Sequence, residues 1–360
     1  MINFGSLLLY LSFFIFTILL INLNIKNKKA NILVTTFALS IPIIFATFRY
    51  GVGTDFFNYI NSMNQIGNLS IKEYINSNFL FEIGHYTIRK ISSILNNYNL
   101  MFGLYASITL ISIYTALMNH KNKVSLTLAL FLYLCIYYPL SLNLMPQFAA
   151  ISLVMISFKY VFSREFFKFS LLVFSASLFH TTALVAFLVY FLWNKKTDSL
   201  TNSWKVALSL FFCIFITLNY QTLITSMSQL DIFSNYETYA SENNQGRNRD
   251  FILKILIVSI FVFFRKSLIK HDNRNKFYIL LMVFSLIIGL TGFTSPWVKR
   301  IALYFEVVQI FLIPSLIYVF VHQRDRILIY LLVFMYGITY FTLVYYILGQ
   351  ANIIPYKFYW

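Results

Sequence analysis

Residues 6–23 read SLLLYLSFFIFTILLINL, and this stretch decides the fold class of the chain. It contains no charged side chain, and as a helix it comes close to the roughly 30 Å thickness of a bilayer's hydrocarbon core. Its apolar residues do not alternate strictly with polar ones, as they do in a barrel strand. Because no basic segment precedes it and no small-residue cleavage site follows, we expect an uncleaved first membrane span.

Similar stretches recur along the chain, which is 59% apolar and only 11% charged. In a soluble domain, roughly a quarter of the residues are charged. We therefore expect an all-α polytopic integral membrane bundle, a single transmembrane domain over residues 1–360 with about ten spanning helices. Beyond the first, the predicted spans lie near 30–48, 99–118, 124–141, 146–162, 205–222, 251–270, 277–295, 300–321 and 327–348.

Residues 168–193 form either one tilted span or two short helices that turn near His180. The distribution of basic residues decides between them, because cytoplasmic loops of membrane proteins are enriched in Lys and Arg. With a helical hairpin around His180 and the N-terminus outside, 18 of the 28 Lys and Arg fall inside, whereas a single span divides them evenly. We therefore predict the hairpin. Charge does not show whether it crosses fully or is re-entrant.

This topology places two long hydrophilic loops, 49–98 and 223–250, on the outer face, where we expect the protein to act. The net charge of +16 comes from short basic clusters between spans, so we expect no nucleic-acid partner. Cys135 and Cys213 are isolated within spans, and no metal-binding spacing appears. We predict no metal and no cofactor.

Ionisable side chains at membrane depth are costly, so each is a functional candidate. His180 is either a proton acceptor or a residue that binds backbone groups freed by a broken helix. Glu306 lies seven residues after Lys299 on one helix face, and an ion pair at a helix junction is the favoured interpretation.

Loop 49–98 has the most polar chemistry. It opens with Arg49-Tyr50-Gly51-Val52-Gly53-Thr54-Asp55, in which two glycines allow close approach to a ligand or simply form a turn. Glu82, His85 and Arg89 fall on one face of an expected amphipathic interfacial helix, as a site or as a solvated stripe. Arginines of the outer face suit a pyrophosphate or anionic headgroups. They are Arg49, Arg89, Arg247, Arg249 and Arg300.

These residues resemble the EpsG family of Wzy-like polymerases of exopolysaccharide and O-antigen. Residues 49–55 with Tyr59 resemble its opening motif, and Glu82-Ile83-Gly84 its Glu-x-Gly motif. Residues 175–184, SASLFHTTAL, are similar to its histidine signature, and Arg300 with Tyr304 and Phe305 also fits. In one departure, Asn143-Leu144-Met145-Pro146-Gln147 has Pro146 where the family often has arginine.

The resemblance implies a glycosyltransferase of the bacterial inner membrane, with both termini on the periplasmic side. It would transfer a glycan from undecaprenyl pyrophosphate onto the terminal sugar of a lipid-linked repeat unit. The lipid bilayer is a partner, and a chain-length regulator is a further candidate partner. His180 or Asp55 would be the base. Arg49, Arg89 and Arg300 would form the anion clamp. Further substrate-binding candidates are Glu82, Gln147 and Tyr304.

Three other functions fit a membrane protein of this length. A lipid-linked oligosaccharide flippase or other transporter would place charges along the spans and often shows repeated halves, which this sequence lacks. A sugar O-acyltransferase would have a histidine in its first spans, where none occurs. An O-antigen ligase differs from a polymerase mainly in its acceptor.

Overall fold

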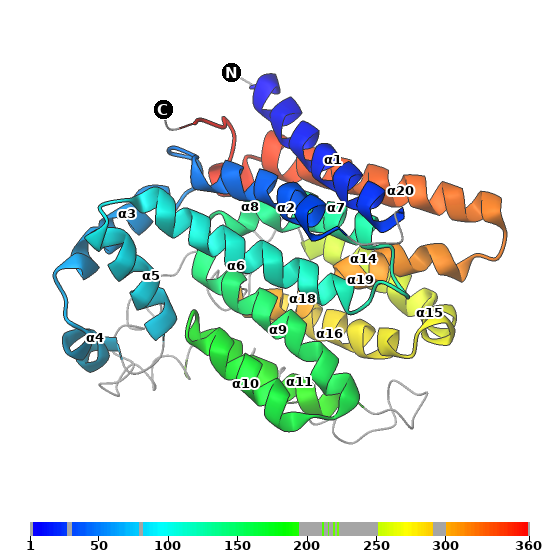
Figure 1. Cartoon of the computed structure of the whole chain (residues 1–360). Coiled ribbons are helices and arrows are strands. Elements are labelled where there is room, and N and C mark those ends of the chain that lie inside the picture. The colour runs from blue at the N-terminus through cyan, green and yellow to red at the C-terminus, as the bar shows by residue number, and fades with distance from the viewer. Residues whose placement is uncertain are drawn as a thin grey trace. The chain divides into compact units, whose positions relative to one another are not determined.

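The computed structural model describes the chain in five stretches, 3–26, 31–78, 82–193, 251–290 and 300–358, and at positions 211, 215, 219 and 222. These residues form helices and no strand, which confirms the all-α prediction (Figure 1). The chain divides into two units, which are described separately. The first comprises Met1–Ile156, Phe174–Thr181 and Phe320–Trp360, and the second comprises Ser157–Val173 and Thr182–Val319.

Several helices of the described residues are long and apolar enough to cross a membrane. They match five predicted spans: Phe4–Asn24, Tyr98–Met118, Met145–Ser163, Arg300–Val319 and Gln323–Ile347. Shorter apolar helices are Ile32–Thr47, Leu126–Ile136, Phe166–Ser177, Thr181–Leu192 and Phe251–Phe263. Apart from the single positions above, the predicted span 205–222 and loop 223–250 lie outside the described residues.

Helix α7 (Leu126–Ile136) is the centre of the first unit, and every one of its residues is buried. Such a helix is apolar on all sides. Helices α1 (Phe4–Lys26) and α20 (Gln323–Phe341) pack against it. A Cβ atom on Gly337 of α20 would lie 2.7 Å from the Phe131 ring, so glycine permits this contact. The predicted span 124–141 breaks at Tyr137, because Pro139 in α8 (Tyr138–Ser141) lacks an N–H group.

Helices α2 (Ile32–Thr47) and α6 (Tyr98–Met118) pack together beside this centre. Each begins at an asparagine whose side chain accepts a hydrogen bond from the first turn. Asn31 accepts from the Leu33 N–H, and Asn97 from the Leu100 N–H. Such caps satisfy N–H groups that have no partner within the helix.

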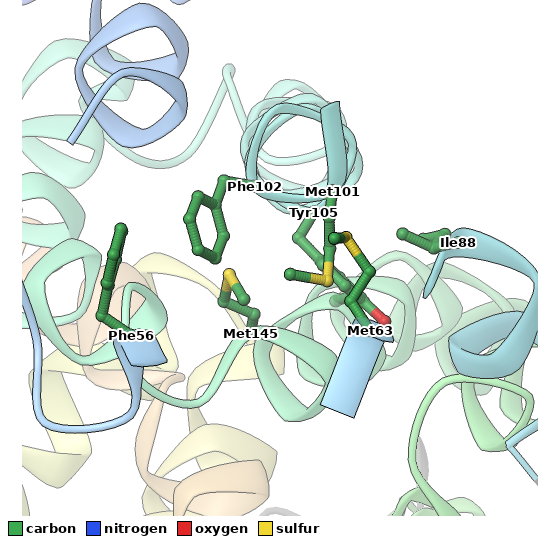
Figure 2. Close-up of a cluster of buried hydrophobic side chains, with 8 residues drawn as sticks. Phe56, Met63, Ile88, Met101, Phe102, Tyr105 and Met145 are labelled. Carbon is green, nitrogen blue, oxygen red and sulfur yellow. The ribbon is translucent and has the colours of Figure 1, made fainter. Parts of the chain in front are cut away.

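The hydrophilic segment 49–98, which we predicted to lie on the outer face, contains three helices, α3 (Phe56–Gly67), α4 (Ile71–Asn78) and α5 (Ile83–Ile94). A capping box starts α4, where Ser70 and Glu73 exchange hydrogen bonds. A buried apolar cluster joins α3 and α5 to α6 and to the start of α9 (Met145–Ser163), and Phe179 packs against it (Figure 2). Its members are Phe56, Met63, Ile88, Met101, Phe102, Tyr105, Met145 and Ala149.

The predicted hairpin around His180 is present. Helix α10 (Phe166–Ser177) is followed by a turn, the 3₁₀ helix η1 (Thr181–Ala186) and α11 (Phe187–Leu192). Within the second unit, the Phe169 ring lies 5.9 Å from the Phe187 ring, so the second arm returns beside the first. The twelve residues of α10 span roughly 18 Å, less than the hydrocarbon core. Each arm is therefore too short to cross a membrane alone.

The rest of the second unit is built around α16 (Arg274–Gly289). The elements that pack against it are α14 (Phe251–Phe263), α15 (Arg265–His271), η4 (Arg300–Ala302), α18 (Leu303–Glu306) and α19 (Gln309–Ser315). The Lys254 ammonium of α14 lies 2.7 Å from the Glu306 carboxylate, and both side chains are buried. Glu306 thus forms an ion pair with a second helix, and the expected pair with Lys299 is not tested because Lys299 lies outside the described residues.

The C-terminal segment returns to the start of the chain. After α20 come a π-helical turn η6 (Thr342–Ile347) and a 3₁₀ turn η7 (Gln350–Asn352). The Tyr356 N–H donates to the Ser6 hydroxyl at 2.9 Å, and the Tyr356 hydroxyl donates to the Phe45 carbonyl at 2.7 Å. Both termini therefore lie at the same end of the first unit (Figure 1).

Candidate functional site

The opening motif of loop 49–98 folds around the turn that joins α8 to α9, forming what we call the Arg49 turn (residues 49–59 with 142–145). The Arg49 Nη2 donates to the Leu142 carbonyl at 2.7 Å, and the Tyr59 hydroxyl donates to the Asn143 carbonyl at 2.7 Å. Gly53 has a φ of +104°, and a Cβ there would lie 2.3 Å from Asn143 Oδ1. Glycine is therefore required at this position for both backbone conformation and space.

Arg49 is buried within the first unit, and only 1% of its surface is exposed. Its guanidinium carbon lies 4.7 Å from the centre of the Phe102 ring, a cation–π contact. Burial lowers the pKa of Arg49 from its usual value. The Arg49 side chain therefore lies buried beneath the motif and is not exposed at the surface.

Other predicted residues lie near this turn. Asp55 is half-buried just before α3, and it accepts a hydrogen bond at 3.4 Å from the Thr54 hydroxyl. Gln147 is buried in α9. Pro146 occupies the second residue of α9, and proline fits the first turn of a helix because no N–H is needed there.

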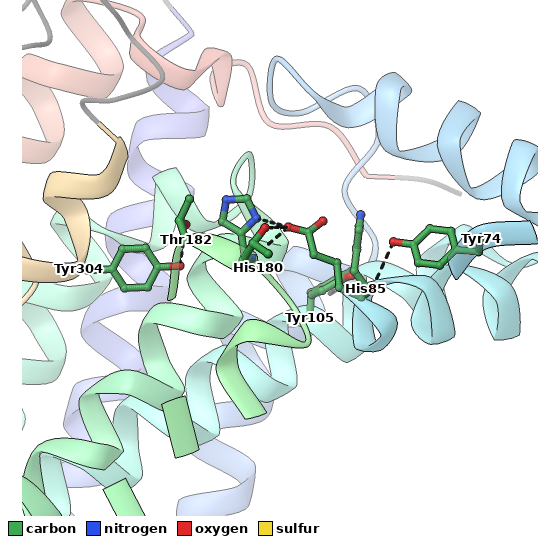
Figure 3. A network of polar contacts seen from close by, with 8 residues as sticks. Tyr74, His85, Tyr105, His180, Thr182 and Tyr304 are labelled. Atoms are coloured by element: carbon green, nitrogen blue, oxygen red, sulfur yellow. Dashed lines mark hydrogen bonds and ion pairs between the residues drawn. The ribbon is translucent and has the colours of Figure 1, made fainter. Parts of the chain in front are cut away.

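A second place in the first unit has a different character. Here the Glu82 carboxylate meets the tip of the hairpin at His180, the residue labelled in Figure 3. Its Oε1 accepts hydrogen bonds from His180 Nδ1 at 2.8 Å, from the Thr181 N–H at 3.1 Å and from the Thr181 hydroxyl at 2.9 Å. We call these three residues the Glu82–His180 cluster. Its two principal side chains remain partly accessible, with 26% of Glu82 and 31% of His180 exposed.

The Glu-x-Gly motif explains why the carboxylate and the imidazole meet. Helix α10 ends near Leu178, whose carbonyl accepts from the N–H groups of Gly84 at 2.8 Å and His85 at 3.1 Å. The free amides at the start of α5 thus satisfy a carbonyl at the end of α10. A Cβ on Gly84 would lie 3.0 Å from that carbonyl oxygen, so glycine allows the two ends to touch.

The charges of the cluster follow from its surroundings. Burial tends to raise the pKa of Glu82, but the hydrogen bond and charge of His180 outweigh it and hold that pKa at about 2. Burial, reinforced by the Arg89 charge, lowers the pKa of His85 to about 3. Glu82 is therefore a carboxylate near neutral pH, while His85 is neutral and its Nδ1 shares a short hydrogen bond with the Tyr105 hydroxyl.

This geometry orients His180 as a base. A carboxylate accepts only from a protonated nitrogen, so the contact with Glu82 places the proton of neutral His180 on Nδ1. The lone pair of Nε2 is then available to take a proton from a hydroxyl, and the carboxylate would stabilise the imidazolium that forms.

The remaining predicted residues are distributed over both units. Arg89 lies on α5, with its guanidinium carbon 6.0 Å from the centre of the Tyr74 ring. In the second unit the Thr182 hydroxyl donates to the buried Tyr304 hydroxyl at 3.1 Å, and Arg300 begins η4. Arg247 and Arg249 lie outside the described residues. The structure thus brings Glu82 to His180, while Arg49 and Gln147 are buried elsewhere.

Two members of the polar network were missed from sequence. Thr181 gives Glu82 two of its three hydrogen bonds, and its position directly after the histidine in the signature was an available signal. Tyr105 lies among apolar residues of a predicted span, where no sequence pattern marked it as part of a polar site. Its hydroxyl was the only sign that a polar partner, here His85, would be found nearby.

Comparison with models of known protein families gives a match over most of the chain. A model of the EpsG family matches residues 31–358, nearly the whole chain. No curated protein and no solved structure matches the chain.

Proposed function

The chain belongs to the EpsG family of Wzy-like polymerases and related glycosyltransferase-type membrane proteins, and we propose that it polymerises an O-antigen or exopolysaccharide. The donor would be a glycan on undecaprenyl pyrophosphate, and the acceptor the terminal sugar of a lipid-linked repeat unit. The reaction would take place at the periplasmic face of a bacterial inner membrane. The observation that carries this proposal is the hydrogen bond between Glu82 and His180 in a partly exposed cluster.

In the proposed step, His180 Nε2 takes the proton of the acceptor hydroxyl. The hydroxyl oxygen forms a bond to the anomeric carbon of the donor glycan, and the bond between that carbon and the pyrophosphate oxygen breaks. The lipid pyrophosphate leaves with the electron pair of the broken bond. Glu82 keeps the imidazole in the productive tautomer and stabilises its charged form, which then returns its proton to water.

The departing pyrophosphate needs cations, because negative charge develops on its oxygen in the transition state. Arg89 is favoured for this role because it lies on the same helix as His85, four residues along. Arg300 remains a second candidate. The burial of Arg49 favours a structural role for that residue. Asp55 stays the alternative base, although it makes no hydrogen bond to the cluster among the described residues.

The proposal is tested in cells that lack the gene, by separating surface polysaccharide on a gel. We expect the deletion to leave a lipid core with a single repeat unit, and the wild-type gene to restore the ladder. His180→Gln should lose the ladder at equal membrane abundance, because general-base catalysis contributes roughly 10²–10⁴-fold. His322→Gln is the matched control, since His322 is exposed and precedes α20.

Other outcomes identify the rival functions. A deletion strain that keeps its ladder and loses a sugar decoration would indicate an acyltransferase. Loss of even the single-repeat form would indicate a flippase or ligase. A full ladder from His180→Gln would remove His180 from the mechanism and leave Asp55 as the base to test.

A further inference from the structure

A small cavity lies beside Arg49 within the first unit. Its volume is about 10 Å³, which is room for one water molecule or one monatomic ion. Side chains of α6 line it, among them Ala106 and Thr109, together with Ser141 and Arg49 itself. The cavity is too small for a phosphate group.

Among the residues that the structure describes, no carboxylate pairs with the charge of Arg49. Its guanidinium contacts the Leu142 carbonyl, the Met145 sulfur and the Phe102 ring, none of which has a full negative charge. The ionisable groups that act on it are all tyrosines: Tyr10, Tyr59, Tyr138 and Tyr356. Moreover, Arg49 Nε is buried without a hydrogen-bond partner among the described residues. A buried cation in this position is costly unless an anion compensates it.

We propose that the cavity binds a single small monovalent anion with the size and charge of chloride, as the counter-ion of Arg49. The anion accepts a hydrogen bond from the unpartnered Nε and neutralises the guanidinium where protein groups supply only dipoles. It stabilises the Arg49 turn from beneath, because Arg49 also holds the Leu142 carbonyl. This site is separate from the Glu82–His180 cluster and does not rest on the proposed polymerase activity.

The first test measures thermal unfolding of the purified full-length protein in detergent. Sodium gluconate is replaced by sodium chloride at constant ionic strength, so that screening stays the same. An anion that binds the folded state raises the unfolding midpoint in a saturable way. We expect a rise of a few degrees for the wild type. If the midpoint does not depend on chloride, the proposal is overturned and the cavity holds water.

Two variants on α6 locate the effect. Ala106→Val adds two carbon atoms at a residue that lines the cavity and should abolish the chloride-dependent shift. Thr115→Val is the control, because Thr115 is exposed on the same helix and should keep the shift. A shift that survives in full in Ala106→Val would place the anion elsewhere and overturn the proposal.

A second measurement does not need a variant that folds. Crystals of the wild type grown in sodium bromide would be examined for anomalous scattering. A bromide peak within hydrogen-bond distance of Arg49 Nε supports the site. Ordered protein density with no peak there at saturating bromide overturns it.

Discussion

The Arg49 turn and the Glu82–His180 cluster differ in what covers them. Both lie in the first unit, both contain residues of the outer loop, and both depend on a glycine that contacts another segment. Arg49 is 1% exposed, however, whereas His180 is 31% exposed and Glu82 26%. Charged residues of one loop thus divide into those that are buried and organise the fold and those that stay partly exposed.

The glycines of the two regions, Gly53 and Gly84, also differ in how deeply their contacts are enclosed. Gly53 meets the side chain of Asn143, inside a turn that the C-terminal segment also contacts, since Gly53 N–H donates to the Asn352 carbonyl at 3.0 Å. Gly84 meets the backbone carbonyl of Leu178, at the accessible tip of the hairpin. The Arg49 turn is therefore held by several segments, whereas the cluster is held by hydrogen bonds between the start of α5 and the tip of the hairpin.

The largest effect is expected from Gly53→Ala, which should disrupt the buried Arg49 turn. The new methyl group would lie 2.3 Å from Asn143 Oδ1, and φ would remain at +104°, which L-residues rarely adopt. We expect the variant to fail to accumulate in the membrane, as measured by immunoblot of membrane fractions. Gly51→Ala is the control, because its φ is +61° and its Cβ would make only an ordinary contact with the Phe57 ring at 3.8 Å, so it should cost only about 1 kcal/mol. Equal accumulation of both variants would contradict this.

The next largest effect is expected from Glu82→Gln, which removes the carboxylate of the partly exposed cluster. An amide neither neutralises imidazolium nor favours one tautomer, so polymer synthesis should fall roughly 10²–10⁴-fold. Membrane abundance should stay near wild type. Glu73→Gln, in the exposed capping box of α4, is the matched control and should retain polymer. Normal ladders from Glu82→Gln would reduce the cluster to a structural contact.

A pH effect of intermediate size should distinguish the cluster from the turn. The pKa of His85 is lowered to about 3, so the folded state favours its neutral form. The stability that neutral His85 contributes to the folded state is complete above the ordinary histidine pKa of about 6.5. It is lost as the pH falls from 6.5 toward 3. The pKa of Glu82 is about 2, so its stabilisation is lost only below about pH 4.5.

Between pH 7 and 4.5 the protein should therefore lose stability through His85, which lies beside the cluster on α5, and not through Glu82. The unfolding midpoint of the detergent-solubilised protein should fall over this range, and His85→Gln should flatten the slope. An unchanged slope in His85→Gln would assign the pH dependence to another histidine, and His322→Gln serves as the control variant.

The smallest effect is expected from Tyr59→Phe, which removes one hydrogen bond from the Arg49 turn. The lost bond to the Asn143 carbonyl should lower the free energy of unfolding by about 1 kcal/mol. Polymer length and its pH profile should not change, because the cluster is untouched. A large loss of polymer at normal abundance would show that the turn takes part in catalysis, and the comparison would then fail.

Much of the fold was predictable because it depends on local composition. Uninterrupted apolar runs predict membrane helices, and the distribution of Lys and Arg predicted the hairpin around His180. The break at Tyr137 could also have been read from Pro139, which was placed inside a predicted span. The lengths of the other helices were less accessible, since interruptions such as that at Phe264 contain no proline or glycine.

The sequence by itself determined the all-helical membrane fold and the hairpin, and it supplied the polar residues from which a site could be proposed. It did not determine which of those residues meet. Spacing on one helix suggested Lys299 for Glu306, whereas packing supplied Lys254 from another helix. Likewise, Arg49 and Glu82 occupy one hydrophilic loop, and only tertiary contacts bury the first and pair the second with His180. The physical reason is that periodicity reports neighbours along a helix, while burial and hydrogen bonding between segments depend on how the helices pack.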